Sequence, residues 1–252
     1  LDLGVPEAVI ETALADLGLA GLYQLRSEES RSSGLRGLRI TVKALEPEPP
    51  HRQWADIRQQ IEAAPLTPAL QQRVLAVFEA LAEAEAAVHG TSPESVHFHE
   101  VGAMDALVDV VGVCAAMEHL APLRVTCTAP PAGHGSVRSA HGQLPVPVPA
   151  VLELARRRQI PLRHDGDLPA VELTTPTGLA LLSVLVDHFS PPQRLTPGAI
   201  GIGLGHRELD RPNLLRLIQL KPQIPEQEPA FSGTDGSDPV PRWQPLVGQE
   251  AW

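Results

Sequence analysis

Aromatic side chains are scarce in this chain, at 3% of 252 residues. A core with so few rings must be built from Leu, Val, Ile and Ala, and aromatic platforms that stack single-stranded nucleic acid are not expected. The formal net charge of −10 leads to the same exclusion, because an acidic chain whose Lys and Arg are scattered repels phosphate backbones. We therefore expect no nucleic-acid partner.

Cysteine and long apolar runs are lacking as well. Cys114 and Cys127 cannot form a disulfide framework, and both stand in apolar runs, which indicates packing in the core. No apolar run approaches the roughly 18 residues of a membrane span, and no leader of basic, apolar and small residues is present. We expect a cytoplasmic protein with no membrane partner. Because the chain starts without Met, we also expect that it is truncated at its start.

The segments that are present alternate between helical and strand-like patterns. They predict, in chain order, a helix within 1–18, a strand over 38–43, helices over 54–64 and 67–90, a helix after 102, a strand over 123–128, helices over 149–158 and 175–185, and a strand over 214–220. Strands separated by helices favour an α/β or α+β fold, with a mixed sheet and flanking helices. We expect one main domain over 1–221. Since 222–252 is rich in Pro and has little periodicity, we expect a flexible tail or linker there.

The sequence HFHEVGAMDALVD, residues 97–109, concentrates side chains that bind metals. His97 and His99 lie two apart in an extended segment, so both rings face the same way, and Glu100 adds a carboxylate beside them. Paired imidazoles at this spacing hold transition ions. The alternative is that both histidines are surface or satisfied core residues.

Two carboxylates follow on the predicted helix after Gly102. Asp105 and Asp109 lie one turn apart on one face, where like charges repel at a cost on the order of a few tenths of a kcal/mol, and Asp is a poor residue for a helix interior. A bound cation would offset this cost, as would a buried basic partner. Attraction to the helix N-terminus explains Asp105 without a ligand but leaves Asp109 unexplained. The sequence therefore predicts a divalent metal site.

Two further histidines stand beside glycines and prolines. His134 lies in PAGHG, and His141 begins HGQLPVPVPA, in which alternating prolines favour an extended loop. Glycine beside histidine indicates backbone that approaches a ligand closely, so both histidines are predicted metal ligands. A proline-rich connector with incidental histidines explains the pattern equally well.

An anion site is predicted from two other motifs. ELTTPTG joins a strand to a helix N-terminus, where backbone N–H groups and hydroxyls can hold phosphate or carboxylate, and helix capping alone is the competing interpretation. GIGLGHR, residues 201–207, is interpreted as a glycine-rich loop ahead of a strand, and Arg side chains there and in the following RPN can clamp an anion. The predicted anion-binding residues are Thr174, Thr175, Thr177, Gly178, Arg207 and Arg211.

The motifs HFHEVGAMDALVDVVG, HGQLPVPVPA, ELTTPTG and GIGLGHRELDRPNLLR occur in an order that resembles the LarC family, the nickel insertion proteins of nickel-pincer cofactor biosynthesis. The resemblance spans the chain from Leu1 to about Leu220. It implies a CTP-dependent cyclometallase of the lyase class, which places nickel into pyridinium-3,5-bisthiocarboxylic acid mononucleotide through nickel–sulfur and nickel–carbon bonds. The five predicted ligands of 97–109 would then hold nickel, and the predicted threonines with Arg207 would contact phosphate or thiocarboxylates of that substrate.

Two parts of that family's pattern are missing here. Members begin upstream with a strand and an acidic glycine-serine segment, and they end in a second domain associated with CTP and manganese or magnesium. We therefore expect CTP and that second metal only with this domain, supplied by a separate partner chain. An apo enzyme of the lactate racemase type is the other expected partner, and we expect a homo-oligomer.

Two other functions compete with nickel insertion. One is a non-catalytic nickel-binding metallochaperone or storage module. The other is a metal-dependent hydrolase with a water activated between the His and Asp groups. The hydrolase ranks last, because the sequence has no recognisable nucleophile triad and no HExxH helix.

Overall fold

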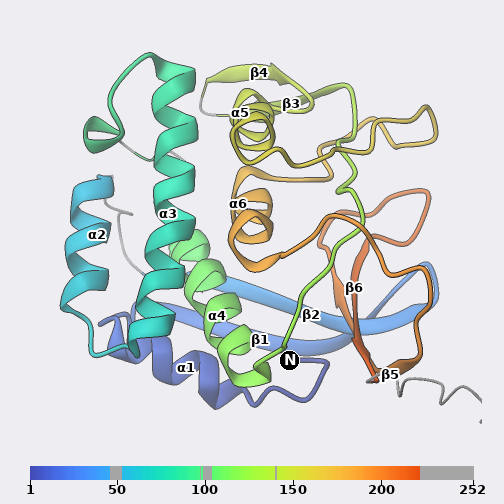
Figure 1. Cartoon of the computed structure of the whole chain (residues 1–252), viewed down its shortest axis with the longest axis horizontal. Coiled ribbons are helices and arrows are strands. Elements are labelled where there is room, and N and C mark those ends of the chain that lie inside the picture. The colour runs from blue at the N-terminus through green and yellow to red at the C-terminus, as the bar shows by residue number, and fades with distance from the viewer. Residues whose placement is uncertain (46–52, 97, 99–103, 140, 222–252) are drawn as a thin grey trace, which may run out of the picture. The chain divides into compact units, whose positions relative to one another are not determined.

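A mixed sheet with strand order β1-β2-β5-β6 lies along one side of the helices in this computed structural model (Figure 1). Its strands are β1 (Tyr23–Ser32), β2 (Leu35–Ala44), β5 (Pro197–Leu204) and β6 (Leu214–Leu220). β2 and β5 are parallel, and the other two pairs are antiparallel. The structure describes residues 1–45, 53–96, 98, 104–139 and 141–221. The mixed sheet with flanking helices confirms the predicted α/β class.

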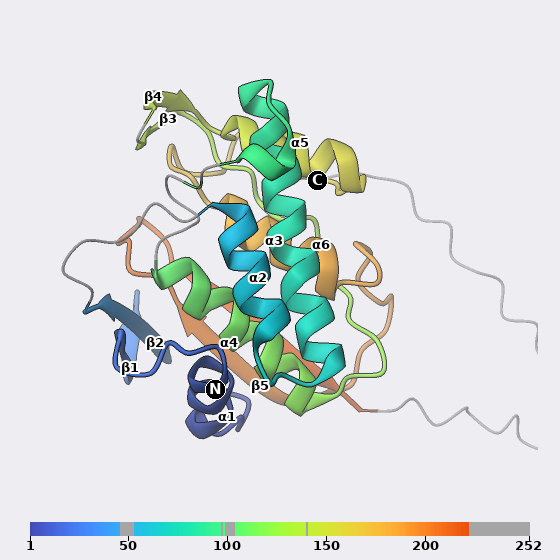
Figure 2. The ribbon, with the colours of Figure 1, turned by 90° about the vertical axis from the view of Figure 1, so that its left-hand side faces the viewer.

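The helices of the described part pack around α3. They are α1 (Glu7–Asp16), α2 (Trp54–Ala63), α3 (Pro68–His89), α4 (Met104–Leu120), α5 (Pro149–Arg158) and α6 (Pro176–Leu185), with a short 3-10 turn η1 (Pro93–Ser95). α3 contacts α2, α4, α5 and α6, whereas α4 contacts β2 and α1 (Figure 2). α4 therefore lies between the central helix and the sheet. Among the described residues, no helix is both long and apolar enough to cross a membrane.

The ends of α3 follow their sequence signals. The Thr67 hydroxyl accepts a hydrogen bond from the Leu70 N–H at 3.1 Å, and Gly90 ends the helix at φ 64°, a conformation that Gly adopts without strain. Val74 and Phe78 are fully buried, whereas Val88 is 40% exposed, because in the last turn Ala86 faces the core instead.

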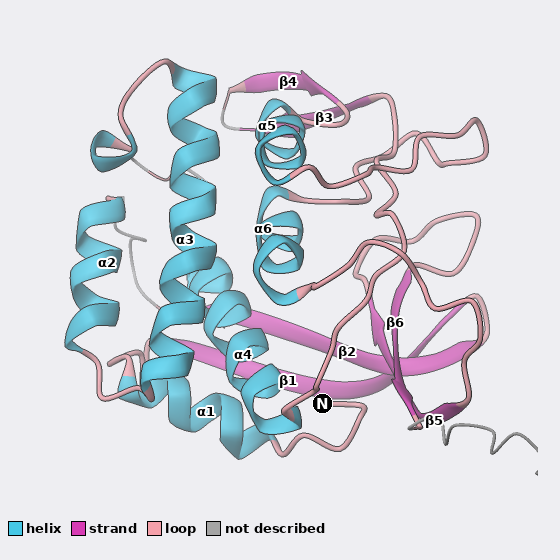
Figure 3. Ribbon diagram, in the orientation of Figure 1, coloured by secondary structure: helices cyan, strands magenta, loops and turns pink. Residues whose placement is uncertain are grey.

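β1 is a strand that the hydrophobic pattern does not predict, because its sequence YQLRSEESRS is mostly polar. Its pairing with β2 holds it in place, from Tyr23 opposite Ala44 to the last pair beside the turn. Ser33 and Gly34 form that turn with φ values of 48° and 84°, and positive φ at both positions is the hallmark of the preferred two-residue hairpin turn. The two long strands are clearly seen in Figure 3.

The predicted strand over 123–128 is wrong. Leu123 is fully exposed, and only Thr126 makes an isolated bridge, to His188. A run of β-favouring residues needs a neighbouring strand to form a ladder, and this run has a single bridge. The segment is an irregular connection after α4.

Two predicted loops are also wrong in part. Residues 201–204 belong to β5, where Gly201 lies against Leu3, whose Cγ would be 2.7 Å from an added Cβ. The loop predicted around His141 contains a hairpin of β3 (Ser136–Ser139) and β4 (Gly142–Pro145). Gly201 therefore permits close packing of the N-terminal segment against β5.

β6 is an edge strand of the sheet within the described residues. Leu215 is 63% exposed and Leu217 is 40% exposed, although both lie in a regular strand. The outer backbone groups of an edge strand offer a template for a further strand. β6 therefore presents apolar side chains beside an unpaired edge.

The thiols lie in or near the core, as predicted for Cys114, which is fully buried on α4. Burial raises the pKa of the Cys114 thiol to about 12, and the nearby charge of Arg73 opposes this only in part. Cys127 is half-buried, and burial raises its pKa too. Both thiols are therefore protonated at neutral pH.

Candidate functional site

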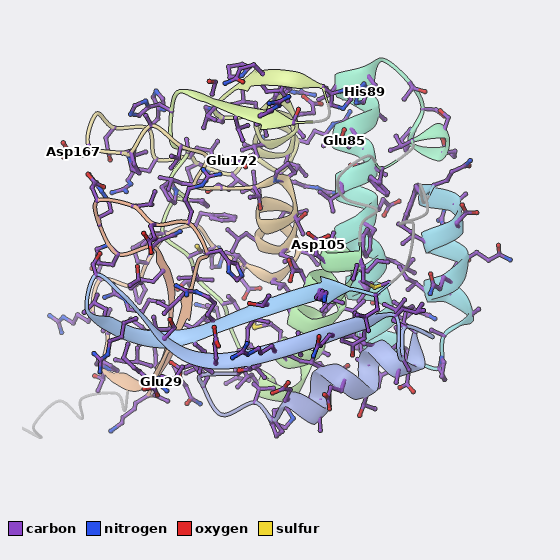
Figure 4. All side chains as sticks on the ribbon, turned by 180° about the vertical axis from the view of Figure 1, so that it is seen from behind. Glu29, Glu85, His89, Asp105, Asp167 and Glu172 are labelled. Atoms are coloured by element: carbon purple, nitrogen blue, oxygen red, sulfur yellow. The ribbon has the colours of Figure 1, made fainter. Side chains whose placement is uncertain are left out.

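The carboxylate pair lies on the first two turns of α4. Asp105 is in the first turn, where its Oδ1 accepts the Ala106 N–H at 2.9 Å, and Asp109 follows one turn later. Both side chains are exposed, whereas the stripe of Met104, Val108, Val111 and Ala115 is buried as predicted. Figure 4 labels Asp105 at the start of α4, above β2. Helix-terminus attraction therefore accounts for Asp105, and Asp109 still needs another explanation.

The pKa of Asp109 is raised from 3.8 to about 6. Burial among protein atoms is the largest cause, and repulsion from Asp105 adds to it, whereas His206 acts in the opposite direction. Part of the Asp109 side chain still reaches water, which screens some of this cost. At neutral pH, Asp109 is thus an ionised group in a setting that disfavours its charge, and a cation would relieve that.

His206 acts electrostatically on Asp109 and was not among the predicted site residues, although it stands in the motif GIGLGHR. Its Nε2 lies 2.9 Å from the Ile40 carbonyl oxygen. A carbonyl can only accept, so Nε2 donates in this contact and Nδ1 is the ring nitrogen on the other side. Metal-binding histidines commonly use one ring nitrogen in this way while the other binds the ion.

The turn that carries His206 is closed by Asn213. The Gly205 N–H donates to the Asn213 carbonyl at 3.0 Å, and Asn213 Nδ2 donates to the Arg207 carbonyl at 3.0 Å. An added Cβ at Gly205 would be 2.5 Å from Asn213 Nδ2, so only Gly fits this close approach. Gly205 and Asn213 thus fix the backbone of the turn in which His206 lies.

The structure gives the position of only some of the other predicted metal ligands. His97, His99 and Glu100 lie outside the described residues. His134 donates from Nε2 to the Leu168 carbonyl at 2.8 Å, and the neighbouring Gly133 has φ 77° and lies directly against Val171. This contact holds the His134 ring in place, as the contact with the Ile40 carbonyl holds the His206 ring.

No three His, Cys, Asp or Glu side chains of the described residues are already spaced to hold an ion. Asp105, Asp109 and His206 therefore do not form a preformed three-ligand metal site. Oxygen and nitrogen donors suit nickel, zinc and copper ions.

Two threonine hydroxyls of ELTTPTG make hydrogen bonds within the protein, which favours the capping interpretation. Thr174 is buried and donates to the Pro131 carbonyl at 2.7 Å. Thr175 is the N-cap of α6, and its hydroxyl accepts the Gly178 N–H at 3.2 Å. The segment before α6 is not a strand, since Glu172 makes only an isolated bridge with Gly133. An anion here would meet the helix N-terminus and Thr177, the second residue of α6.

The two arginines differ in their availability. Arg211 binds Asp210 through two nitrogens, at 2.9 and 3.2 Å, and donates to the Asp167 carbonyl at 2.5 Å. Arg207 is exposed and directly follows His206. Of the two, Arg207 is therefore the better placed to meet an anion that is drawn to the same turn.

Comparisons with known proteins agree with the predicted resemblance. A family model described as nickel insertion protein matches residues 1–237. Relatives whose names carry the words "nickel insertion protein" include one from Synechococcus elongatus, 43% identical over 233 residues, and one from Myxococcus xanthus, 46% identical over 220 residues. These matches cover 90% and 86% of this chain but only 58% and 54% of the relatives. The chain thus spans little more than half the length of the relatives it matches. No solved structure matches.

Proposed function

Because the chain belongs to the nickel insertion protein family, we propose that it binds Ni²⁺ and passes it to pyridinium-3,5-bisthiocarboxylic acid mononucleotide, which yields the nickel-pincer cofactor. Family membership supports a role in nickel insertion, and the identity of the acceptor is our proposal. The observation that carries the metal role is Asp109, an ionised carboxylate beside Asp105 and His206 in a setting that disfavours its charge. Nickel would enter this site as the substrate of the reaction.

The carboxylate and imidazole ligands suit an ion that is bound only transiently. The carboxylates of Asp105 and Asp109 and the Nδ1 lone pair of His206 attract a divalent ion without enclosing it. Coordination positions then remain for the thiocarboxylate sulfurs of the acceptor, which are softer ligands. The exposed Arg207 would hold the phosphate of the acceptor as a point of attachment next to the metal.

CTP dependence and the lyase reaction are part of the same proposal. The chain spans 54–58% of the relatives' length, so we assign CTP use, with manganese or magnesium, to the part of the relatives that the chain does not match. Turnover then requires that part as well as the residues of this chain. Metal loading is the step that the residues of this chain perform.

The test is reconstitution with Ni²⁺, CTP, Mg²⁺ or Mn²⁺ and the bisthiocarboxylate mononucleotide, with the unmatched part of a relative supplied as a second chain. We expect the nickel-pincer absorbance in the complete mixture and its loss in Asp109→Asn and in His206→Ala. Glu79→Gln, an exposed change on α3, is the control that keeps activity. Nickel binding without any product in the complete mixture would favour a storage module instead. Hydrolysis of a phosphate or amide substrate without nickel transfer would favour a hydrolase.

A further inference from the structure

The two edges of the four-stranded sheet differ in their composition. β1, at one edge, carries four charged side chains among its ten residues, and charges on an edge strand discourage pairing with a further strand. β6, at the other edge, has the sequence LLRLIQL, with a single charge on Arg216 and no proline. α4 packs on β2, whereas no helix of the described residues packs closely on β6 (Figure 3). Within this part of the chain, β6 is therefore the edge that is open to another strand.

The exposed leucines of β6 have no side-chain neighbours on the strand with which they pair. Leu215 lies opposite Gly203 of β5, and Leu217 lies opposite Gly201. An added Cβ at Gly203 would meet nothing within 4 Å, so the space beside Leu215 is open. Leu3 covers Gly201, yet Leu217 stays 40% exposed. Because cross-strand side-chain pairs stabilise a sheet, a strand added at the edge would supply the neighbours that β5 does not offer.

The backbone groups of β6 alternate between β5 and the open side. The Gly205 N–H donates to the Asn213 carbonyl, and in an antiparallel ladder every second residue bonds to the same neighbour. The odd-numbered residues of β6 up to Leu217 therefore bond to β5, and the N–H and C=O groups of the even-numbered residues over 214–218 point away from it. A further strand must face these outward groups with outward groups of its own.

A second copy of β6 meets this requirement when it runs antiparallel to the first. With a two-fold axis through Leu217, this leucine faces its own equivalent, Arg216 faces Ile218, and Leu214 faces Leu220, so all seven residues are paired. A two-fold axis through Arg216 would instead place two guanidinium groups opposite each other, which is destabilising. An axis through Ile218 would pair fewer residues. The strand is thus most complementary to itself in the register centred on Leu217.

We propose that two copies of this chain associate through antiparallel pairing of their β6 strands around Leu217, which joins their sheets into one. The pairing covers Leu215 and Leu217 and gives hydrogen-bond partners to the even-numbered residues over 214–218. The turns that carry His206 precede β6, so they lie at opposite ends of the strand pair and are not brought together. No residue of β6 has a role in the proposed function, and the inference does not rest on it.

The test is disulfide crosslinking of the full chain in a Cys127→Ser background, in which the remaining native thiol, Cys114, is buried. In Leu217→Cys, the two new thiols would face each other with Cα atoms about 4.5 Å apart, within reach of a disulfide. In Leu215→Cys, a more exposed position of the same strand, they would be about 14 Å apart. We expect a covalent dimer on air oxidation of Leu217→Cys alone. Equal crosslinking of both variants, or none in either, would overturn the inference.

A second readout needs no added thiol. As the concentration of the wild-type chain rises, hydrogen exchange of the Arg216 and Ile218 amides should slow, because these amides become hydrogen-bonded in the dimer. Leu217→Lys should abolish the effect, since two ammonium groups would then face each other, and the amides of β1 are the control that should not respond. Exchange that is independent of concentration would contradict the proposed dimer. Protection that appears only when the unmatched part of a relative is added would assign the edge to that part and exclude a second copy.

Discussion

Asp109 is a residue whose charge the folded protein disfavours. Its neighbours on α4 are buried apolar residues. Burial and repulsion from Asp105 both raise the pKa of the Asp109 carboxylate. Asp109→Asn should therefore raise the free energy of unfolding at pH 7.5, by about 1 kcal/mol after allowance for the water that reaches the side chain. The same change should abolish the stabilisation that Ni²⁺ gives to the wild type at this site.

The pH dependence has a definite sign. The folded-state pKa of Asp109, about 6, lies above its ordinary 3.8, so the folded protein binds more protons between these values and loses stability as pH rises through them. The gain from Asp109→Asn should be full above pH 6 and vanish near pH 4. Denaturant unfolding at several pH values measures it, with Glu79→Gln as the control. A gain that is equal at both pH values would contradict this explanation.

The connection between β5 and β6 determines where His206 lies. Gly205→Ala should displace this turn, because the new Cβ would lie 2.5 Å from Asn213 Nδ2, and should destabilise the protein by about 1–3 kcal/mol. Gly203→Ala, two residues earlier in β5, meets nothing within 4 Å and is the matched control. We expect weaker Ni²⁺ binding in Gly205→Ala alone, measured by calorimetry. Equal binding in the two variants would show that the turn does not position the histidine.

The same connection shows what could be predicted from sequence. Helices with a Thr or Pro start and a Gly end, such as α3, are predicted almost to the residue, because these signals act locally. β1 could not be predicted, since its polar residues become a strand only through pairing with β2, and Ser33-Gly34 was its one local signal. His206 was missed for a related reason. Its partners, Ile40 and Asp109, are distant in sequence, and only the fold brings them together.

At the scale of the whole molecule, the edge strand β6 leaves apolar side chains exposed beside unpaired backbone groups. Pairing of two β6 strands would cover Leu215 and Leu217 and extend the sheet, so we expect concentration-dependent self-association of the wild-type chain. Leu217→Lys should reduce it, as measured by sedimentation velocity. Leu123→Lys, at a fully exposed position away from the sheet, is the control. A wild-type chain that stays monomeric at every concentration would contradict the expected homo-oligomer.

The protonation of the Cys114 and Cys127 thiols affects the proposed binding and release of nickel. A metal ion must displace the thiol proton to bind sulfur, and burial opposes that loss at both cysteines by raising the pKa of each thiol. An ion bound at α4 would therefore have carboxylate and imidazole ligands, from which it can dissociate. The two thiols would compete poorly for it. Under the proposed function, nickel would then pass to the sulfur ligands of the acceptor with little competition from these two thiols.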